Sequence, residues 1–575
     1  MSVTRHTLTE GKPVSAPYDG GFDVSCDICV VGAGTAGAVA AVSAAMDGTD
    51  VFTVDIASLP GGIGTAGCIW DYYFGAEGGL FERINSTADE ILAGGNYLPS
   101  TVPNYKESYP TAVKALALGN WFAKYGVRSL WSAFVTAVFM EDAAVCGVEA
   151  FDGEKNVRIR AKVVIDGAEG AVCRLLNLPD LGGRRSDGKS ARFSKTVGKL
   201  LNGHLYGIGA FCGDFAGETA EGAARLELEA AVKSPCLDKL DDSTRLYQVG
   251  QETGRREVRC FVTERVYYFE DHLAGNKPDN PIFYTFSPLD NANPDIWNED
   301  EDFQDWQFIC ALHASGLSIG IPPECLIPKN TRGLLLAGKH IGTGHTMTST
   351  VRMRRDMEKC GEAAGTMASM MVRYGVDALT VAGELFDELR ERLAATGCYD
   401  LSNDRGVCDL NIPDGRMWKS VRLPETVEEL RESLSSIYPS LGLFSVRTAE
   451  GRGLDIASIK EALAVWTGSR EKLLRENSAV ALGLLGDRRS LPVLREILMR
   501  EPETYVYSSP KKYYFPWLHE TVLSNYPKAV CLIGRMAEES DKELLERAAG
   551  YDGMDAERLK AREYAASALR KLSAE

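Results

Sequence analysis

The chain has 575 residues and a formal net charge of −17, with 45% hydrophobic and 25% charged residues. This apolar share is enough for large buried cores, so the composition excludes a disordered or fibrous protein. At roughly 150 residues per domain, the length predicts about three or four domains. The acidic balance argues against general affinity for nucleic acid or for anionic membranes, because both attract clustered Lys and Arg.

The cysteines and the N-terminal region predict a reduced, cytoplasmic protein. Fourteen cysteines are scattered along the chain and do not form the dense framework of a small secreted domain. The first 21 residues are polar and do not resemble a secretory signal. The sequence has no HExxH motif and no paired CxxC motifs, so we expect no metal site.

The first predicted elements form a βα unit around a glycine-rich turn. A strand over 27–31 leads into Gly32-Ala33-Gly34-Thr35-Ala36-Gly37, and a helix follows over 38–46. The first glycine permits the tight turn, the second lets a pyrophosphate approach the backbone, and the third lets the helix pack on the strand. The helix N-terminus offers free N–H groups to the phosphates. A buried strand, turn and helix therefore explain this uncharged stretch better than a membrane span.

A second strand is predicted over 51–55, and it ends in Asp55. This carboxylate follows Gly32 by 23 residues, where it can accept hydrogen bonds from ribose hydroxyls and disfavours a 2′-phosphate. The order of strand, glycine turn, helix, strand and acid indicates a dinucleotide-binding unit.

A second glycine-rich loop favours FAD over NAD. It reads Gly61-Gly62-Ile63-Gly64-Thr65-Ala66-Gly67 and comes straight after the second strand. A flavin cofactor is longer than a nicotinamide cofactor and needs more backbone along it, which Gly61, Gly62, Gly64 and Thr65 would supply. The alternative, from composition alone, is a flexible loop.

These residues resemble the FAD-dependent oxidoreductase family, which shares its FAD-binding design with the fumarate reductase and succinate dehydrogenase flavoproteins. The resemblance covers roughly residues 24–372. Segment 127–136 resembles the family's strand whose backbone meets the adenine, and it contains Val135. Segment 161–168 resembles the strand that usually ends in Asp-Ala-Thr-Gly, although this chain has Asp166-Gly167-Ala168-Glu169-Gly170 instead.

Two later segments carry the same resemblance. Residues 333–339 resemble the late strand of "NLLVAGR" type, which places Gly338 beside the flavin. Residues 361–366 resemble the "GQAAGTAA" helix start, with Gly361 and Ala364. A helix that starts there would turn its N–H groups toward the pyrimidine carbonyl and stabilise the reduced flavin. No second GxGxxG occurs, so we expect no separate NAD(P)H domain, and the electron donor or acceptor stays open.

The resemblance also suggests catalytic residues. His345 and Arg352 follow the late strand, where family members place polar residues facing the substrate, and Arg256 belongs to an element that resembles "RESRR". A histidine can move a proton near neutral pH, and an arginine can hold a carboxylate, an alkoxide or an enolate. The alternatives are a hydrogen-bonded structural histidine and structural ion pairs. We expect His340 to be structural and the acidic run 299–302 to be a solvated loop.

The C-terminal third is predicted to be helical. Residues 478–494 resemble a HEAT-like repeat, with an alanine–leucine helix, a Gly-Asp turn and a second helix that a proline opens. Residues 529–548 are a weaker second copy, and 564–572 could close the array. Two or three helix pairs cannot bury their apolar faces well on their own. We therefore expect them to pack on the flavin domain or on another subunit, in a homo-oligomer or with a protein partner. The alternative is a plain helical cap.

The predicted fold is therefore α/β, with a Rossmann-like FAD-binding domain, an inserted α+β substrate region and an all-α C-terminal domain. The FAD-binding domain is expected at 1–175 and 325–375, around a substrate region at 176–324. A linker with helices is expected at 376–455, and the HEAT-like domain at 456–575.

The predicted function is that of an FAD enzyme that transfers a hydride between a small polar organic substrate and flavin N5. His345 would handle the proton, and Arg352 and Arg256 the charge. One alternative is an ene-reductase of the fumarate reductase kind. Another is a scaffold that keeps FAD while its helical tail binds a partner.

Overall fold

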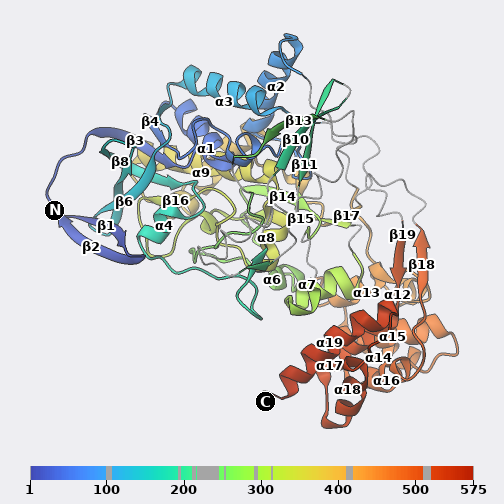
Figure 1. Cartoon of the computed structure of the whole chain (residues 1–575). Helices are drawn as coiled ribbons and strands as arrows, with labels where there is room; N and C mark the ends of the chain where they lie inside the picture. The colour runs from blue at the N-terminus through green and yellow to red at the C-terminus, as the bar shows by residue number, and fades with distance from the viewer. Residues whose placement is uncertain are drawn as a thin grey trace.

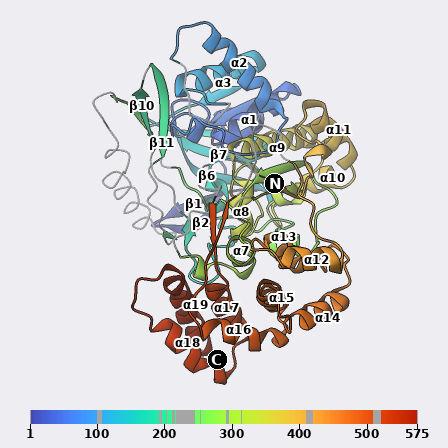
Figure 2. The ribbon, with the colours of Figure 1, turned by 90° about the vertical axis from the view of Figure 1, so that its right-hand side faces the viewer.

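The computed structural model describes most of the chain (Figure 1). The described residues are 2–98, 107–191, 196–201, 203–209, 215–216, 245–251, 254–290, 295–312, 315–409, 419–508 and 520–573. Figures 1 and 2 both show a large α/β part and a group of helices, α14 to α19, gathered at one end of the molecule. The α/β class with a helical C-terminal part is thus confirmed.

A nine-stranded sheet forms the first layer. Its order is β2-β1-β6-β7-β8-β3-β4-β5, and β16 also pairs with β8. The pairs β3–β4, β4–β5, β3–β8 and β8–β16 are parallel, whereas β1, β2, β6 and β7 pair antiparallel. The strands are β1 (Val3–Thr9), β2 (Lys12–Tyr18), β3 (Val24–Val31), β4 (Val51–Val54), β5 (Arg128–Leu130), β6 (Phe134–Glu141), β7 (Ala144–Phe151), β8 (Asn156–Asp166) and β16 (Leu334–Leu336).

The length of β8 explains how a late strand joins an early sheet. Its residues 156–160 pair with β7, and residues 164–166 pair with β16. Because β3 occupies the other edge of β8 from residue 159 to 166, both partners share one edge of the strand. The carboxyl ends of β3, β4, β8 and β16 consequently lie side by side.

Helices α1 (Thr35–Met46) and α9 (Arg354–Tyr374) pack closely together against this sheet. A Cβ on Gly361 would lie 2.0 Å from the Ala36 carbonyl oxygen, and one on Gly365 would lie 2.3 Å from that of Ala40. Glycine is therefore required where the two backbones meet. This burial accounts for the uncharged sequence of α1, and no helix among the described residues is long and apolar enough to cross a membrane.

Two expected elements differ from the structure. Segment 127–136 is not one strand but two, β5 and β6, which lie far apart in the sheet and are separated by a turn with Ser132 at φ +54°. Helix α9 begins at Arg354, so Gly361 does not start a helix. The family-like glycine lies two turns inside α9, where its contact is with α1.

Shorter sheets and helices form the second part of the molecule. One antiparallel sheet consists of β14 (Phe283–Ser287), β15 (Ser315–Ile321) and β17 (Val407–Asp409), and another of β10 (Thr196–Leu201), β11 (His204–Gly209) and β13 (Arg245–Val249). A two-residue ladder joins β9 (Ser190–Ala191) to β12 (Phe215–Ala216). The α-helices described in the first 400 residues, besides α1 and α9, are α2 (Leu80–Ala93), α3 (Thr111–Tyr125), α4 (Ala171–Leu175), α6 (Phe269–Leu273), α7 (Glu301–Gln304), α8 (His345–Val351), α10 (Ala378–Ala382) and α11 (Phe386–Thr396).

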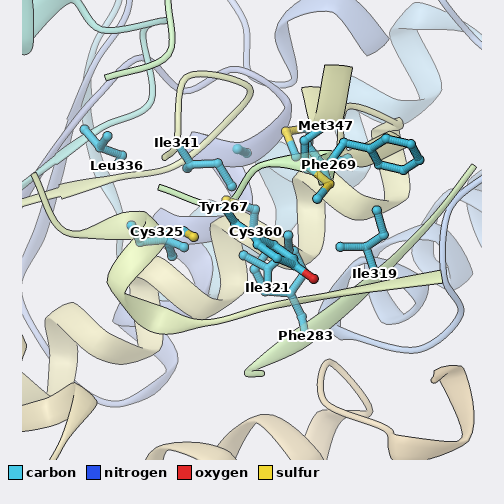
Figure 3. Close-up of a cluster of buried hydrophobic side chains, with 14 of the residues drawn as sticks. Tyr267, Phe269, Phe283, Ile319, Ile321, Cys325, Leu336, Ile341, Met347 and Cys360 are labelled. Atoms are coloured by element: carbon cyan, nitrogen blue, oxygen red, sulfur yellow. The ribbon is translucent and has the colours of Figure 1, made fainter. Parts of the chain in front are cut away.

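A shared apolar core holds the two parts together. Figure 3 shows Phe283, Ile319 and Ile321 from β14 and β15 turned toward Met347 of α8 and Cys360 of α9. All five side chains are buried. Because apolar burial stabilises by about 25 cal/mol per Å², this contact fixes the small sheet relative to α8 and α9.

The C-terminal helices dock on the segment around residue 305. Both Arg447 and Arg535 pair with the buried Asp305 carboxylate, each at 2.6 Å. The Phe308 and Tyr564 rings stack with centroids 4.6 Å apart. The helices are α12 (Val427–Leu434), α13 (Ser440–Arg447), α14 (Ile456–Trp466), α15 (Lys472–Leu484), α16 (Leu491–Leu498), α17 (Asn525–Met536), α18 (Lys542–Ala549) and α19 (Ala556–Leu572).

The C-terminal part was expected to be wholly helical, but the structure differs from this prediction. A hairpin of β18 (Tyr505–Ser508) and β19 (Glu520–Leu523) separates α16 from α17. Pairs of helices do follow the expected order, and the assignment of a HEAT-like repeat stays a prediction.

Candidate functional site

A cavity of about 990 Å³ lies at the carboxyl ends of β3, β4, β8 and β16. This is where open α/β sheets bind their ligands, and the volume is at the upper end of the roughly 300–1,000 Å³ typical of ligand sites. The predicted site residues on its wall are Gly32, Gly34, Thr35, Ala36, Asp55, Gly62, Val135, Arg256, Gly338 and Arg352.

The first glycine turn has the geometry expected for a pyrophosphate site. Gly32 has φ +86°, and a Cβ there would lie 2.7 Å from the Ala168 amide nitrogen. A Cβ on Gly37 would lie 1.8 Å from the Gly32 carbonyl oxygen, so this third glycine serves helix packing and does not line the cavity. Within the described residues no side chain caps α1 at Gly34. The N–H groups of the first turn of α1 are therefore left for a ligand at the cavity, where the positive end of the helix dipole lies.

Asp55 stands on the cavity wall just after β4. Its two carboxylate oxygens accept backbone N–H groups from Ala33 and from Ala57, the latter at 2.6 Å. Burial raises the pKa of this carboxyl despite these two hydrogen bonds. Each oxygen keeps a second lone pair, so the side chain can still accept a ribose hydroxyl. Val135 lines the same cavity, because the turn before β6 crosses over the end of β4.

The second glycine loop packs on the first. The Gly61 amide donates to the Ala33 carbonyl oxygen at 2.9 Å, and a Cβ on Gly62 would lie 2.9 Å from the Gly34 Cα. Gly64 lies against the Arg354 guanidinium, and the Thr65 hydroxyl donates to the Pro60 carbonyl oxygen at 2.8 Å. Gly62 therefore faces the cavity, whereas Gly61, Gly64 and Thr65 shape the loop.

Three of the predicted cofactor residues lie behind the cavity wall. The Asp166 carboxylate accepts the backbone N–H groups of Ala168, Val172 and Cys173 at 2.8–3.2 Å, so it holds the turn after β8. Gly361 and Ala364 are buried in α9 and are not part of the lining. The end of α9 that reaches the cavity is its first turn, with Met353, Arg354 and Met357 on the wall.

Unsatisfied polar groups in the cavity call for a polar ligand. Both ring nitrogens of His340, which is 0% exposed, lack a hydrogen-bond partner in the described part of the chain. Burial lowers the pKa of His340, so the ring is neutral and needs one donor and one acceptor. Asp71 Oδ1 and Arg354 Nε are also buried and lack a hydrogen-bond partner among the described residues. Leaving such groups unpaired costs about 1–3 kcal/mol each. These groups, together with the two glycine loops and the open helix end, fit FAD.

Arg256 and Arg352 converge on one carboxylate at the cavity wall. Arg352 donates to the Asp290 carbonyl oxygen and lies 3.2 Å from its Oδ2, and Arg256 Nη2 lies 3.7 Å from the same Oδ2. Burial, with the neighbouring charge of Arg256, lowers the pKa of Arg352 to about 10. Two guanidinium groups therefore face the cavity with one carboxylate between them.

His345 does not join this group, which corrects its expected acid–base role. Its Nδ1 lies 2.6 Å from Glu257 Oε1, and its Nε2 lies 2.7 Å from Glu299 Oε2. Burial alone would lower the pKa of His345, but the two carboxylates raise it well above its ordinary value. The ring is an engaged, buried cation that does not line the cavity, and no nitrogen is left for a substrate. His340, which was expected to be structural, is the histidine on the wall.

The acidic run 299–302 also differs from the expected solvated loop. Glu299 and Asp302 are buried, and Glu299 faces both His345 and the buried Arg184. Burial and the neighbouring acidic groups raise the pKa of Asp302 to about 7. Two of the four acids, Glu299 and Asp302, are thus buried, and His345 and Arg184 from other parts of the chain lie against Glu299.

The sequence reasoning missed two polar groups of the cavity wall, Asp71 and Tyr73. Asp71 and Tyr73 lie two residues apart just after the second glycine loop, a spacing that would have placed them on one face of an extended segment. At the rim, Glu169 pairs with Lys339 at 3.1 Å and with Arg255 at 3.8 Å. These two cations hold the pKa of Glu169 below its ordinary value although burial alone would raise it.

The fold and the cavity together define an FAD-binding flavoprotein. A family model described as FAD dependent oxidoreductase matches residues 27–200 and 214–393. The chain therefore belongs to the FAD-dependent oxidoreductase family, and it is an enzyme with FAD as its cofactor. No curated protein matches the chain.

Solved structures with some likeness to the chain are described by names of different activities. A geranylgeranyl bacteriochlorophyll reductase-like protein from Thermoplasma acidophilum has 12% identity and a TM-score of 0.32, over 82% of this chain and 98% of that one. A p-nitrophenol 4-monooxygenase from Pseudomonas putida DLL-E4 has 12% identity and a TM-score of 0.32, over 81% and 99%. For a 3-ketosteroid-delta4-(5alpha)-dehydrogenase from Rhodococcus jostii RHA1 the values are 16% and 0.19, over 26% of this chain and 46% of that one. The chain thus spans under half of that dehydrogenase, and likenesses this low carry no argument about a substrate.

Proposed function

We propose that this FAD-dependent oxidoreductase transfers a hydride between a carbon atom of a small polar organic substrate and N5 of the flavin. The observation that carries the proposal is the pair Arg256 and Arg352, which face the same cavity as the two glycine loops. Guanidinium groups bind carboxylates in bidentate fashion and stabilise the negative charge that develops on an oxygen atom. The substrate class that fits is a hydroxy, amino or enoic acid.

The remaining residues act by binding and orientation. When bound, FAD supplies a two-electron acceptor or donor at its N5 atom. The N–H groups of Thr35 and Ala36 hold the pyrophosphate at the start of α1, and Asp55 holds a ribose hydroxyl. Asp290 holds the two guanidinium groups close together, because both contact its Oδ2. The substrate charge is then placed in the same cavity as the cofactor.

The two alternatives have less support. An ene-reductase of the fumarate reductase kind needs histidines that bind the substrate carboxylate, and His345 is held between Glu257 and Glu299 instead. A scaffold role would make no use of two arginines on the cavity wall. The C-terminal helices do not line this cavity within the described residues, so partner binding by the tail is a separate hypothesis.

The test is anaerobic reduction of the bound flavin, followed by its visible absorbance, with a panel of hydroxy and amino acids. This assay needs no knowledge of the natural electron acceptor. Enoic acids are tested in the reverse direction, as oxidants of the chemically reduced enzyme. Arg352→Met should slow the reaction with the best compound by roughly 10²–10³-fold while FAD stays bound.

The matched control is Arg422→Met, because that arginine is exposed and pairs with Glu429 at the surface. It should leave the rate unchanged. If the wild-type flavin exchanges electrons with no member of the panel, the proposed function is wrong. If Arg352→Met reacts at the wild-type rate, the two-arginine site has no part in it.

A further inference from the structure

The segment that follows the second glycine loop alternates between the cavity and the core. Ile69, Asp71 and Tyr73 line the cavity, whereas Trp70 and Tyr72 are 0% and 2% exposed on the other side. This period of two is that of an extended strand. The segment therefore presents one carboxyl and one phenol to the cavity as a pair.

The buried side of the segment is held firmly. Trp70 Nε1 donates to the Thr111 hydroxyl at 3.0 Å. The Tyr72 hydroxyl donates to the Glu358 carboxylate at 2.9 Å and accepts from Lys114 Nζ at 2.9 Å. With both neighbours fixed, Asp71 has little freedom to turn away from the cavity.

The carboxyl of Asp71 is not used up by the fold. Its backbone forms a bridge with Ser108, whose side chain hydrogen-bonds to the carboxyl, and its carbonyl oxygen accepts from Arg354 Nη1 at 3.4 Å. Oδ1 is buried and has no hydrogen-bond partner in the portion of the chain that the structure describes. A carboxyl oxygen in that position either holds a proton or awaits a donor from a bound molecule.

The surroundings set the protonation of this carboxyl near neutral pH. Burial raises the pKa of Asp71 to about 6, and the Ser108 hydrogen bond and the Arg354 charge only partly oppose it. The Tyr73 phenol lies near enough to Arg352 to raise the pKa of that guanidinium. The segment therefore reaches the end of the cavity that holds the two arginines. The titratable or charged groups on the elements around Asp71 are Cys68, Tyr72, Tyr73, Glu107, Tyr109, Lys114, Arg352, Arg354, Arg355 and Glu358.

We propose that Asp71 is the general acid–base of this cavity, and that its carboxyl exchanges a proton with the substrate while Arg256 and Arg352 hold the substrate's negative charge. This inference rests on the proposed function. In the oxidising direction the substrate carbon loses a hydride, which FAD accepts, so the substrate is oxidised and the flavin reduced. The O–H or N–H proton of the substrate passes to the Asp71 carboxylate, and the electron pair it leaves becomes the new C=O or C=N π bond. The reverse direction returns the same proton.

The first test needs no substrate. Infrared difference spectra of the FAD-loaded full chain are recorded on either side of pH 6, for the wild type and for Asp71→Asn. Subtracting one difference from the other removes other buried carboxyls, such as Asp302 and Asp356, whose pKa values burial raises to about 7 and about 8. A protonated-carboxyl band that titrates near pH 6 should remain. If no such band remains, the proposal is wrong.

The second test is the pH profile of flavin reduction with the best substrate. In the wild type the rate should fall below pH 6, because a protonated Asp71 cannot accept the proton. Asp71→Asn should lose this fall in rate, the acidic limb of the pH profile. It should also slow the reaction by roughly 10²–10⁴-fold with FAD still bound. Asp71→Glu keeps a carboxyl and should keep a limb, which guards against an Asn variant that folds poorly.

The controls separate the possible failures. Asp552→Asn changes an exposed aspartate far along the chain and should keep both rate and limb. If Asp71→Asn keeps the wild-type limb while Arg352→Met is slow, the role of Asp71 is wrong and the proposed function stands. If the limb disappears in His340→Gln instead, His340 is the acid–base and the proposal is overturned. If the wild-type flavin reacts with no compound, both proposals are wrong.

Discussion

The first glycine turn offers a sharp prediction, because its second and third glycines have different neighbours. Gly34 has φ −71° and lines the cavity, and a Cβ on it would meet no described atom within 4 Å. An alanine can adopt this backbone, so Gly34→Ala should fold as the wild type does. Its methyl group would narrow the space in front of the first turn of α1. We expect FAD to bind about 10–100-fold more weakly, which corresponds to about 1.4–2.8 kcal/mol.

Gly37→Ala, unlike Gly34→Ala, should destabilise the fold itself. Its Cβ would lie 1.8 Å from the Gly32 carbonyl oxygen, whereas ordinary contact begins at 3.4 Å, so the turn and the helix must separate by about 1.6 Å. Overpacking of this kind costs about 1–3 kcal/mol. The apo protein itself should therefore be less stable, and FAD binding should be lost together with the shape of the turn.

Thermal melting with and without FAD, combined with flavin fluorescence titration, separates the two effects. Gly34→Ala should melt as the wild type does when apo and should gain less from FAD, since a ligand stabilises by RT ln(1 + [L]/Kd). Gly119→Ala, at an open helical position outside the cavity, is the control and should bind FAD normally. If Gly34→Ala binds FAD as tightly as the wild type, the turn is not the pyrophosphate site.

Three further outcomes are expected. Asp55→Ala should lose FAD on gel filtration, because the ribose loses its acceptor; full occupancy would contradict the ribose assignment. His340→Leu, which removes both unpaired ring nitrogens, should fold normally but shift the visible spectrum or the affinity of bound FAD, and an unchanged spectrum and affinity would show that the ring does not contact the cofactor. His345→Gln should destabilise the protein by about 3–5 kcal/mol, because it removes the cation that lies between the buried Glu257 and Glu299. The His345 contribution is complete below its ordinary pKa of about 6.5 and is lost as pH rises toward the raised folded-state value. Wild-type melting temperatures should therefore fall from about pH 6.5 upward more steeply than those of His345→Gln, and parallel curves would contradict the buried cation.

Local patterns were sufficient to predict where the first glycine turn and Asp55 lie on the cavity wall. The order of strand, glycine turn, helix and strand depends on backbone conformations that neighbouring residues determine, and these lie within one βαβ unit. Gly32, Gly34 and Asp55 therefore stand where their spacing indicated. The family resemblance added the late strand, and β16 does return to the sheet beside β8.

Roles that depend on distant partners could not be obtained in this way. Glu257 and Glu299 stand 88 and 46 residues from His345 in the chain, and their approach turns an expected catalyst into a buried cation. The same approach buries Glu299, whereas Glu301 of the same acidic run stays exposed. Gly361 was expected to begin a helix near the flavin, but it is the packing of α9 on α1 that requires it.

The sequence by itself thus determined the FAD-binding unit, the α/β class and the helical nature of the C-terminal third, because these follow from local periodicity and turn chemistry. Only the tertiary structure decided which polar side chains face the cavity: Asp71 and His340 do, and His345 does not. The physical reason is that a buried polar group needs a hydrogen-bond partner, and folding decides whether that partner comes from elsewhere in the chain or is left to a bound molecule.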